Sequence, residues 1–394
     1  MITLSGADLV LPDRVIRRGS IVIHEGRIAA IETGAIDAGA GLTVIDLSNH
    51  TIVPGFIDVH VHGVEGIDVL DGDDAVAAVA SRLPKYGVTA FCPTSVACAP
   101  SRLTTMLESA AHARSSEAAG AARVLPAHLE SNFINPEWNG AQPVQCLRTY
   151  KPQGKRPEGD FMGHEILQAI RAHRDVVGIV TLAPEMAGGL DLVRELVLAG
   201  HRVSLGHTGA TYEEARDAIA AGANHATHLF NRMSSITSRS PGVVGAVLES
   251  DAVAAEIICD GHHVHPSLVS MAIRLKSVTR MMAITDGTAV TGLPTGSRSR
   301  LGDQTIIAGD KTAVLENGTL AGSILTMDAA FRMLVTRIGL SLMDAARMCA
   351  TTPAESIRAA DLGVIAVGKW ADLTVLNRDL DVTHTYIGGE AAGN

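Results

Sequence analysis

The stretch PGFIDVHVHG, residues 54–63, decides the fold, because a short apolar strand in it ends on two histidines. Alternate residues of a strand point to the same side, so His60 and His62 can converge on one ion. An isolated H-x-H pair is weak evidence, since histidines at such positions are as often structural. The interpretation therefore depends on what the rest of the chain places beside this strand.

Eight candidate strands follow one another along the chain, separated by stretches with the apolar spacing of helices. The candidate strands are residues 55–60, 88–93, 124–130, 176–183, 202–206, 225–229, 255–260 and 281–286. The helical spacing is clearest in residues 73–83, 101–113, 164–174, 190–200 and 211–222. This alternation predicts a (β/α)8 TIM barrel of the α/β class, although an open doubly wound sheet has the same local pattern.

A histidine or a carboxylate stands at or just beyond the end of four other candidate strands. These residues are Glu130, His207, His228 and Asp286. In a barrel the carboxyl ends of all strands meet on one face, where the active sites of this fold lie. Together with the H-x-H pair, they form a nitrogen and oxygen ligand set that suits Zn²⁺, Fe²⁺ or a similar divalent ion. The set predicts a closed barrel with a metal site on that face.

Several further histidines follow the seventh candidate strand, in DGHHVHP, residues 260–266. His263 is the one best placed to face a ligand, and His262 and His265 flank it. We therefore take His263 as the candidate for contact with a substrate.

Both ends of the chain have the composition of β-sheet. Ile and Val alternate with polar residues through the first 53 residues, and the same texture returns in residues 368–390, where glycines separate the segments. We expect one small β domain built from residues 1–53 and 358–394, with the barrel domain formed by residues 54–357.

Composition restricts the class of protein. A chain of 394 residues is long enough for one large domain and a smaller companion. A hydrophobic content of 46% with 19% charged residues excludes intrinsic disorder. The 32 Lys and Arg residues against 42 Asp and Glu give a net charge of −10, which argues against nucleic acid and anionic membranes as partners.

Cysteine usage and the first residues favour a cytoplasmic location. The five cysteines are scattered without a CxxC pair, so neither a disulfide framework nor a thiolate zinc site is indicated. Asp8 and Asp13 interrupt the apolar core that a signal peptide needs, and no apolar run approaches the roughly 18 residues of a membrane helix.

Two local features can be read before the fold is known. The proline-rich, basic segment 149–159 interrupts the alternation and predicts a long surface loop, whose basic residues form either a solvated face or a lid over a substrate. Thr211 and Glu214 have the spacing of a capping box, which predicts the start of a helix.

The chain as a whole resembles the N-acetylglucosamine-6-phosphate deacetylases of the amidohydrolase superfamily. The resemblance rests on motifs that occur in this order: PGFIDVHVHG, HLESNFINPE, VTLAPE, LGHTGATYEEA, THLFNRM, ICDGHHVHP, ITDGTAVTG and NGTLAGSILTMD. It implies a (β/α)8 barrel with a β-sandwich formed by both termini. It also implies Glu130, His207 and His228 as ligands of the metal that the family shares.

The resemblance leaves the number of ions open. This chain keeps His60 and His62, which some members of the family replace, so a second ion that also contacts Glu130 and Asp286 is compatible with the sequence. In the resemblance, Glu130 on the third strand is the residue that bridges the metals, whereas many relatives use a carbamylated lysine on the fourth strand. The fourth candidate strand of this chain, VVGIVTLAPE, contains no lysine. One or two divalent ions, Zn²⁺ or Fe²⁺, are expected in each subunit.

The implied reaction is removal of the acetyl group from N-acetyl-D-glucosamine 6-phosphate, which yields D-glucosamine 6-phosphate and acetate. Asp286 matches the family's general acid and base, and His263 matches a histidine that contacts the substrate. Asn231 and the backbone of Arg232 match a local phosphate cradle. Arg239 matches an arginine that reaches the phosphate from the neighbouring subunit, which implies a homodimer.

The sequence departs from the family pattern beside the expected substrate. Gln142 replaces a substrate-binding histidine, and Ser131 and Asn132 replace the usual residues after the metal-bridging glutamate. These changes leave open the same chemistry on N-acetylgalactosamine 6-phosphate or another N-acyl sugar derivative. Deamination of a cyclic amine and a catalytically idle sugar-phosphate sensor are more distant alternatives. The phosphate-binding residues argue against the deaminase, and Asp286 argues against the sensor.

Overall fold

Eight parallel strands form the barrel in the computed structural model, which describes residues 1–36, 43–116, 118–151 and 159–393. In chain order these strands are β6 (Phe56–Val61), β9 (Val88–Ser95), β11 (Ala127–Glu130), β12 (Val177–Leu182), β13 (Arg202–Leu205), β14 (His225–Ala226), β15 (Ala254–Ile258) and β16 (Met281–Ile284). Each strand pairs in parallel with the next one along the chain.

The barrel closes between its last and first strands. Gly287, just after β16, forms a parallel bridge with Val61, and the backbone N–H of Asp286 donates to the carbonyl oxygen of His60 at 2.9 Å. An open doubly wound sheet has no such contact between its two edge strands. The expected (β/α)8 barrel is therefore confirmed.

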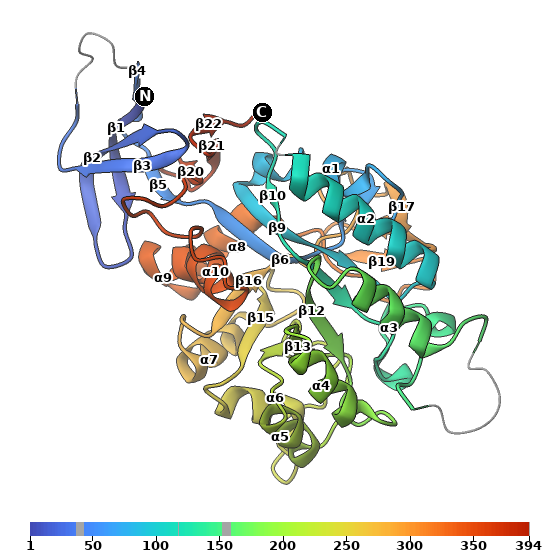
Figure 1. The fold of residues 1–394 in the computed structure, drawn as a ribbon. Helices are drawn as coiled ribbons and strands as arrows, with labels where there is room; N and C mark the ends of the chain where they lie inside the picture. Colours follow the sequence, from blue (N-terminus) through green and yellow to red (C-terminus); the bar gives the residue numbers. More distant parts are fainter. Residues whose placement is uncertain (37–42, 117, 152–158, 394) are drawn as a thin grey trace.

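Helices surround the barrel, as Figure 1 shows. They are α1 (Ala75–Ala80), α2 (Pro100–Ser116), α3 (Gly163–Ala172), α4 (Gly189–Leu198), α5 (Tyr212–Ala220), α6 (Gly242–Glu249), α7 (Pro266–Lys276), α8 (Met327–Met333), α9 (Leu342–Ala346) and α10 (Thr352–Ser356). Their apolar stripes pack inward. In α3, for example, Ile166, Leu167 and Ile170 are buried. The expected capping box at Thr211 and Glu214 starts α5.

Both ends of the chain build a second, eight-stranded sheet. Its strands are β1 (Ile2–Val10), β2 (Val15–His24), β3 (Arg27–Glu32), β4 (Thr43–Asp46), β5 (Thr51–Pro54), β20 (Leu373–Leu376), β21 (Val382–Ile387) and β22 (Glu390–Ala391). The two ends join where β20 pairs antiparallel with β5. This sheet has its own apolar core, separate from that of the barrel. The barrel lies between β5 and β20 in the sequence. We therefore propose that residues 54–357 form the barrel domain and that residues 1–53 and 358–394 together form the terminal β domain.

The strands differ from the expectation in three places. The segment 124–130 is divided into β10 (Arg123–Val124) and β11 around Pro126, which has no N–H to donate to a neighbouring strand. The strands β14 and β16 end two residues before His228 and Asp286. An additional antiparallel sheet follows the eighth strand; its members are β17 (Arg298–Leu301), β18 (Gln304–Ala308) and β19 (Ala313–Leu315). Much of the predicted loop 149–159 lies outside the described residues.

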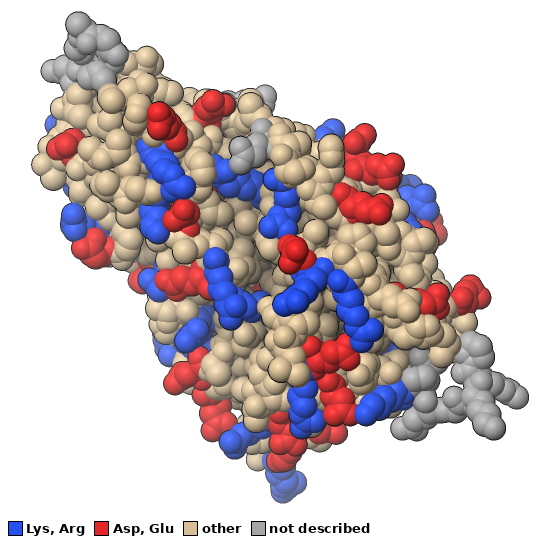
Figure 2. Space-filling model, viewed as in Figure 1, with Lys and Arg blue, Asp and Glu red and all other residues tan. Residues whose placement is uncertain are grey.

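Charged side chains are spread over the surface. Figure 2 shows Lys and Arg interspersed with Asp and Glu on the face that it draws. Within the described part of the chain, no helix is both long enough and apolar enough to cross a bilayer.

An ion pair joins the barrel to the terminal sheet. Arg123 of β10 donates through Nε to Oδ2 of Asp372 at 2.7 Å and through a terminal nitrogen to Oδ1 at 3.2 Å. The Asp372 side chain is only 3% exposed. The guanidinium of Arg123 also lies 4.3 Å from the ring centroid of Trp370, and so does that of Arg27. Arg27 instead pairs with the exposed Asp361.

These two arginines offer a matched comparison of stability. Arg123→Met should lower the free energy of unfolding by about 3 kcal/mol, because it leaves the Asp372 carboxylate buried without its partner. Arg27→Met, which removes the same stacking contact, an exposed ion pair and an exposed hydrogen bond to the carbonyl oxygen of Gly368, should cost less, at about 1 kcal/mol. Urea denaturation followed by circular dichroism measures both. Equal losses in the two variants would contradict the buried ion pair as the main contact at this junction.

Candidate active site

A cavity of about 100 Å³ opens at the carboxyl ends of the barrel strands. Its lining contains most of the residues that the sequence singled out, together with three glycine or alanine positions and one apolar residue. The lining residues are His62, Glu130, Gly140, Ala141, Gln142, His207, His228, Asn231, Arg232, His263, Asp286, Leu320 and Gly322. His60 lies beside this cavity and is fully buried. Residues as far apart in the sequence as His62 and Gly322 are thus brought to one place.

One cluster in the cavity consists of Glu130, His207 and His228. Oε1 of Glu130 lies 2.7 Å from Nε2 of His207 and 2.9 Å from Nε2 of His228. The two ring nitrogens are 3.1 Å apart. These three side chains come from the ends of the third, fifth and sixth strands, and all are buried.

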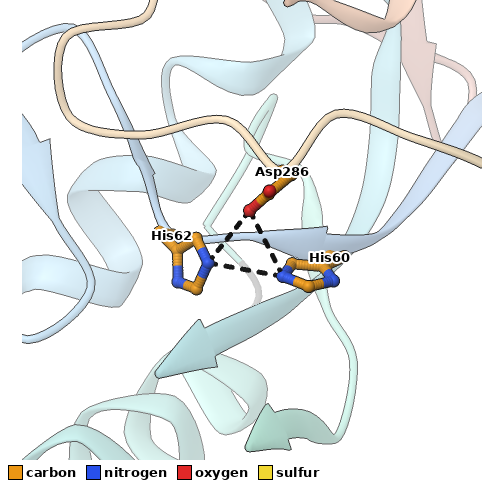
Figure 3. A group of neighbouring side chains, drawn as sticks. All are labelled: His60, His62 and Asp286. Atoms are coloured by element: carbon orange, nitrogen blue, oxygen red, sulfur yellow. Dashed lines mark hydrogen bonds and ion pairs between the residues drawn. The ribbon is translucent and has the colours of Figure 1, made fainter. Parts of the chain in front are cut away.

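A second cluster consists of His60, His62 and Asp286, which Figure 3 shows facing one another. The two Nε2 atoms are 3.3 Å apart, and Oδ1 of Asp286 lies 3.1 Å from that of His62 and 3.4 Å from that of His60. Glu130 connects the clusters, because its oxygens lie 3.6 Å from Nε2 of His62 and 3.9 Å from Nε2 of His60.

The donor set of both clusters fits a divalent cation. In each cluster, two imidazole nitrogens face each other at about hydrogen-bond distance, with a carboxylate oxygen beside them. A neutral imidazole carries one N–H and one lone pair, so a ring with its N–H on Nδ1 directs the lone pair of Nε2 into the cluster. Imidazole nitrogens with carboxylate oxygens are the ligands that Zn²⁺ and Fe²⁺ accept.

Acceptors outside the clusters fix the orientation of three of the four rings, whereas Nδ1 of His228 has no hydrogen-bond partner among the described residues. Nδ1 of His62 lies 2.9 Å from the carbonyl oxygen of Thr94, and Nδ1 of His207 lies 2.9 Å from that of Trp138. Nδ1 of His60 lies 2.8 Å from a carboxylate oxygen of Glu256. An acceptor at Nδ1 holds the N–H there and leaves the Nε2 lone pair for the cluster.

The backbone at three cluster residues is in the left-handed region. The φ angle is 47° at His207, 31° at His228 and 51° at Asp286. Residues other than glycine rarely adopt such angles, and they persist where surrounding contacts hold them. Glu185 provides such contacts beside His207, because its carboxylate accepts hydrogen bonds from the Thr208 hydroxyl at 2.6 Å and from the Gly209 N–H at 2.7 Å.

Burial and charge set the pKa values of the clusters. Burial alone would raise the pKa of Glu130, but His207 and His228 hold it well below its usual range. Burial lowers the pKa of His60 to about 3. For His228, burial acts downward, but the hydrogen bond and charge of Glu130 raise its pKa to about 9. The cluster therefore keeps Glu130 ionised, as a metal ligand must be.

His263 stands on the cavity wall with an acidic partner. Its Nδ1 lies 2.6 Å from Oδ2 of Asp260, and Oδ1 of Asp260 accepts the backbone N–H groups of His262 and His263, each at 2.8 Å. Burial would lower the pKa of His263, but the hydrogen bond and charge of Asp260 raise it. His262 and His265 are exposed and do not line the cavity.

Gln142 lines the cavity, but both ends of its amide are already bonded. Its nitrogen donates to Oε2 of Glu130, and its oxygen accepts the N–H of Ala97 at 2.7 Å. Ser131 and Asn132 do not line the cavity. The Ser131 hydroxyl donates to the carbonyl oxygen of Thr181, and Asn132 donates to backbone carbonyl groups. The two residues after Glu130 therefore secure their loop.

The residues expected at a phosphate divide into two groups. Asn231 and Arg232 line the cavity, whereas Arg239 is exposed and lies outside it. Among the described carboxylates, none forms an ion pair with either arginine. One chain therefore brings together all the expected residues except Arg239.

Sequence reasoning missed a buried polar group beneath the clusters. Glu256 and His128 are both fully buried, and with His60 they form a third group of possible ligands. A signal for His128 was available, since it stands two residues before Glu130 and so points to the same side of the strand. For Glu256 the sequence contains only a weaker signal, namely a single carboxylate within an otherwise apolar strand.

Known proteins are similar to this chain over most of its length. The model of the amidohydrolase family matches residues 51–392. The N-acetylglucosamine-6-phosphate deacetylase of Bacillus subtilis (strain 168) is 32% identical over 389 residues, which cover 98% of this chain and 95% of the relative. The N-acetylgalactosamine-6-phosphate deacetylase of Escherichia coli O157:H7 is also 32% identical, over 94% of this chain and 93% of the relative.

A solved structure is similar as well. It is a variant of the N-acetyl-D-glucosamine-6-phosphate deacetylase of Mycobacterium smegmatis, in complex with N-acetyl-D-glucosamine 6-phosphate. The match covers all of this chain and 99% of that one, with 32% sequence identity and a TM-score of 0.88. The similarity thus extends through both the barrel and the terminal sheet.

The contact between Asp260 and His263 predicts a measurable titration. Because the carboxylate stabilises the imidazolium, His263 should titrate above the usual histidine pKa, and Asp260→Asn should lower its midpoint by on the order of one pH unit. The chemical shift of the ring Cε1–H, followed by NMR against pH and assigned with His263→Gln, measures it. Asp251→Asn, which changes an exposed residue outside the cavity, is the control. An unchanged midpoint in Asp260→Asn would show that this contact does not set the charge of His263.

Proposed function

Because this chain belongs to the amidohydrolase family, within the N-acetylglucosamine-6-phosphate deacetylases, we propose that it hydrolyses the acetamide of an N-acetylated amino-sugar 6-phosphate. The default substrate is N-acetyl-D-glucosamine 6-phosphate, and the products are D-glucosamine 6-phosphate and acetate. One observation carries the proposal: the two histidine–carboxylate clusters share a cavity with Asn231, Arg232 and His263. Hydrolytic and phosphate-binding groups therefore face the same space.

The galactosamine epimer is the second candidate substrate. It is supported by the relative named for N-acetylgalactosamine 6-phosphate, which is as similar to this chain, at 32% identity, as the B. subtilis enzyme. The epimers differ in the orientation of one hydroxyl, and Gln142 replaces a histidine beside the cavity. The reaction is the same for both sugars.

The family implies a divalent metal ion, and we propose Zn²⁺ or Fe²⁺ with one or two ions in each subunit. Glu130, His207 and His228 would hold the first ion. His60 and His62 would hold the second, with Glu130 and Asp286 also contacting it. When bound, such an ion polarises the amide carbonyl and lowers the pKa of a coordinated water molecule.

Asp286 moves the proton in this proposal. Its pKa is lowered, against the effect of burial, by the neighbouring rings of His60 and His62 and by its hydrogen bond with His62, so its carboxylate is ionised and can accept a proton. Oδ1 faces the two histidines, and Oδ2 is the oxygen left for the attacking water. The same proton then passes to the amine nitrogen as the carbon–nitrogen bond breaks, because an amine leaves poorly without it.

His263 stabilises the carbonyl oxygen as negative charge develops on it. The bond from Nδ1 to Asp260 leaves Nε2 as the donor available to the cavity. The raised pKa favours the imidazolium, which is a stronger donor to an oxyanion than the neutral ring.

The phosphate would be held by Asn231 and the backbone of Arg232 from one chain and by Arg239 from a second chain. The exposure of Arg239 outside the cavity supports a role in another subunit, as does the exposed Ile236 in the same loop, at 54%. A guanidinium matches the oxygens of a phosphate. A homodimer is therefore part of the proposal.

We also propose a cytoplasmic location. All five cysteines are free and buried, as is usual for a protein of a reducing compartment.

Asp286→Asn tests the hydrolytic role against that of a sugar-phosphate sensor. Turnover should fall by about 10² to 10⁴-fold, because the amide can neither accept nor return the proton. Acetate release measures turnover, isothermal titration with N-acetylglucosamine 6-phosphate measures binding, and elemental analysis checks that the metal content is retained. Near-normal turnover would remove Asp286 from the reaction. A wild-type protein that binds the sugar phosphate without releasing acetate would support the sensor.

Arg239→Ala tests phosphate recognition. We expect kcat/KM to fall by about 10- to 100-fold for the phosphorylated sugar, because a charge-assisted contact is lost, with little change for unphosphorylated N-acetylglucosamine. Arg216→Ala, at an arginine of α5 outside the cavity, is the control. Equal losses on both sugars would show that Arg239 does not bind the phosphate.

Mixed dimers test whether Arg239 acts in the neighbouring subunit. A dimer of one Asp286→Asn chain and one Arg239→Ala chain contains one complete site if Arg239 acts across the interface, and none if it acts within its own chain. Activity on the phosphorylated sugar should therefore rise when the two impaired variants exchange subunits. Activity that stays at the level of the separate variants would contradict the shared site.

A further inference from the structure

Glu256 is a fully buried carboxylate on β15, a strand that contributes no side chain to the cavity lining. Its Oε2 lies 2.8 Å from Nδ1 of His60 and accepts the backbone N–H of His228 at 3.2 Å. These two residues belong to different clusters. One carboxylate oxygen therefore contacts both halves of the candidate metal centre from below.

The other surroundings of Glu256 do not explain why a carboxylate is buried there. No Lys or Arg of the described chain forms an ion pair with it, and its Oε1 has no hydrogen-bond partner. His128 is the nearest alternative, but its Nδ1 lies 3.7 Å from Oε1 and 3.1 Å from the carbonyl oxygen of Val59, so it donates to Val59 instead. Its Nε2 lies 2.7 Å from the Thr181 hydroxyl.

A buried carboxylate costs free energy unless hydrogen bonds compensate for the lost water. Here the two compensating donors are the ring of His60 and the backbone of His228. An apolar residue would fill this position in the barrel interior at lower cost. The contacts that Glu256 makes therefore point to a role at the metal centre.

The contact with His60 selects one form of its ring. The ionised form of the Glu256 carboxyl group is an acceptor only, so with Glu256 ionised Nδ1 of His60 carries the proton and Nε2 carries the lone pair. That lone pair points toward Nε2 of His62 at 3.3 Å and Oδ1 of Asp286 at 3.4 Å. Without the carboxylate, His60 is free to adopt the opposite form, whose Nε2–H cannot bind a cation.

The contact with His228 acts on the backbone. His228 has a φ of 31°, which is unfavourable for a residue with a side chain, and its N–H is fixed by Glu256. The same oxygen thus orients the ring of one candidate ligand and the main chain of another.

We propose that Glu256 is a positioning residue that prepares His60 for the second metal ion and steadies His228 beside the first. The inference rests on the proposed function, in which His60 and His62 hold the second ion. In this inference, Glu256 helps to retain the second ion although its carboxylate does not face the cavity.

The experiment measures bound zinc in the full-length protein, by elemental analysis after dialysis against a graded series of chelator concentrations. Wild type should retain two ions and His60→Ala one. Glu256→Leu, which offers no acceptor to His60 or His228, should release the second ion at about 10- to 100-fold lower chelator concentration while keeping the first, since loss of such outer contacts weakens metal affinity by that factor. Asp372→Asn is the control, because Asp372 is also buried but its partners, Arg123 and the backbone N–H of Gly388, lie outside the metal centre.

The outcomes separate this inference from the proposal on which it rests. Two ions held at wild-type affinity by Glu256→Leu, with His60→Ala reduced to one, would overturn the role of Glu256 alone. One ion in both wild type and His60→Ala would overturn the second site and this inference together. Acetate release by the wild-type protein tests the reaction independently of either result.

A measurement on the wild-type protein covers the case in which the Glu256 variants do not fold. In zinc-loaded protein with ¹⁵N-labelled histidine, NMR distinguishes the protonated from the unprotonated ring nitrogens. We expect a proton on Nδ1 of His60, in a hydrogen bond with a carboxylate, with His60→Gln used for assignment. A proton on Nε2 instead would overturn the proposal.

Discussion

Closure of the barrel is the constraint on which the site depends. The hydrogen bond from the Asp286 N–H to the carbonyl oxygen of His60 joins the last strand to the first, and the two residues that it connects face each other in the second cluster. The contact that closes the barrel is therefore also the contact that brings the residues of the second cluster together. Side chains from the first and eighth strands can share an ion only because the sheet has no free edge there.

Closure also places charge inside a protein core, which must then be compensated locally. Glu130 is compensated by the histidines around it, and Glu256 by donors from His60 and His228. The left-handed backbone at His207, His228 and Asp286 is a further cost. Contacts just outside the clusters, such as those of Glu185, hold these geometries. Residues that touch neither metal nor substrate therefore belong to the function of the site.

The barrel and its cluster residues could be predicted because they follow from periodicity and position. Glu130 and His207 stand at or just after short apolar strands, and parallel strands bring their carboxyl ends together. Glu256 could not be assigned a role in this way, since its strand is apolar throughout and only the packed barrel shows that it meets His60. The two hydrogen bonds of the Gln142 amide could not be predicted either, because its partners, Glu130 and Ala97, lie 12 and 45 residues away in the sequence.

The most direct test of the account is acetate release by the metal-loaded wild-type protein. N-acetylglucosamine 6-phosphate, N-acetylgalactosamine 6-phosphate and unphosphorylated N-acetylglucosamine would be compared side by side. The account predicts release from a phosphorylated sugar, with kcat/KM higher by about tenfold or more than for the unphosphorylated one. No release from either sugar phosphate, or equal kcat/KM with and without the phosphate, would contradict it.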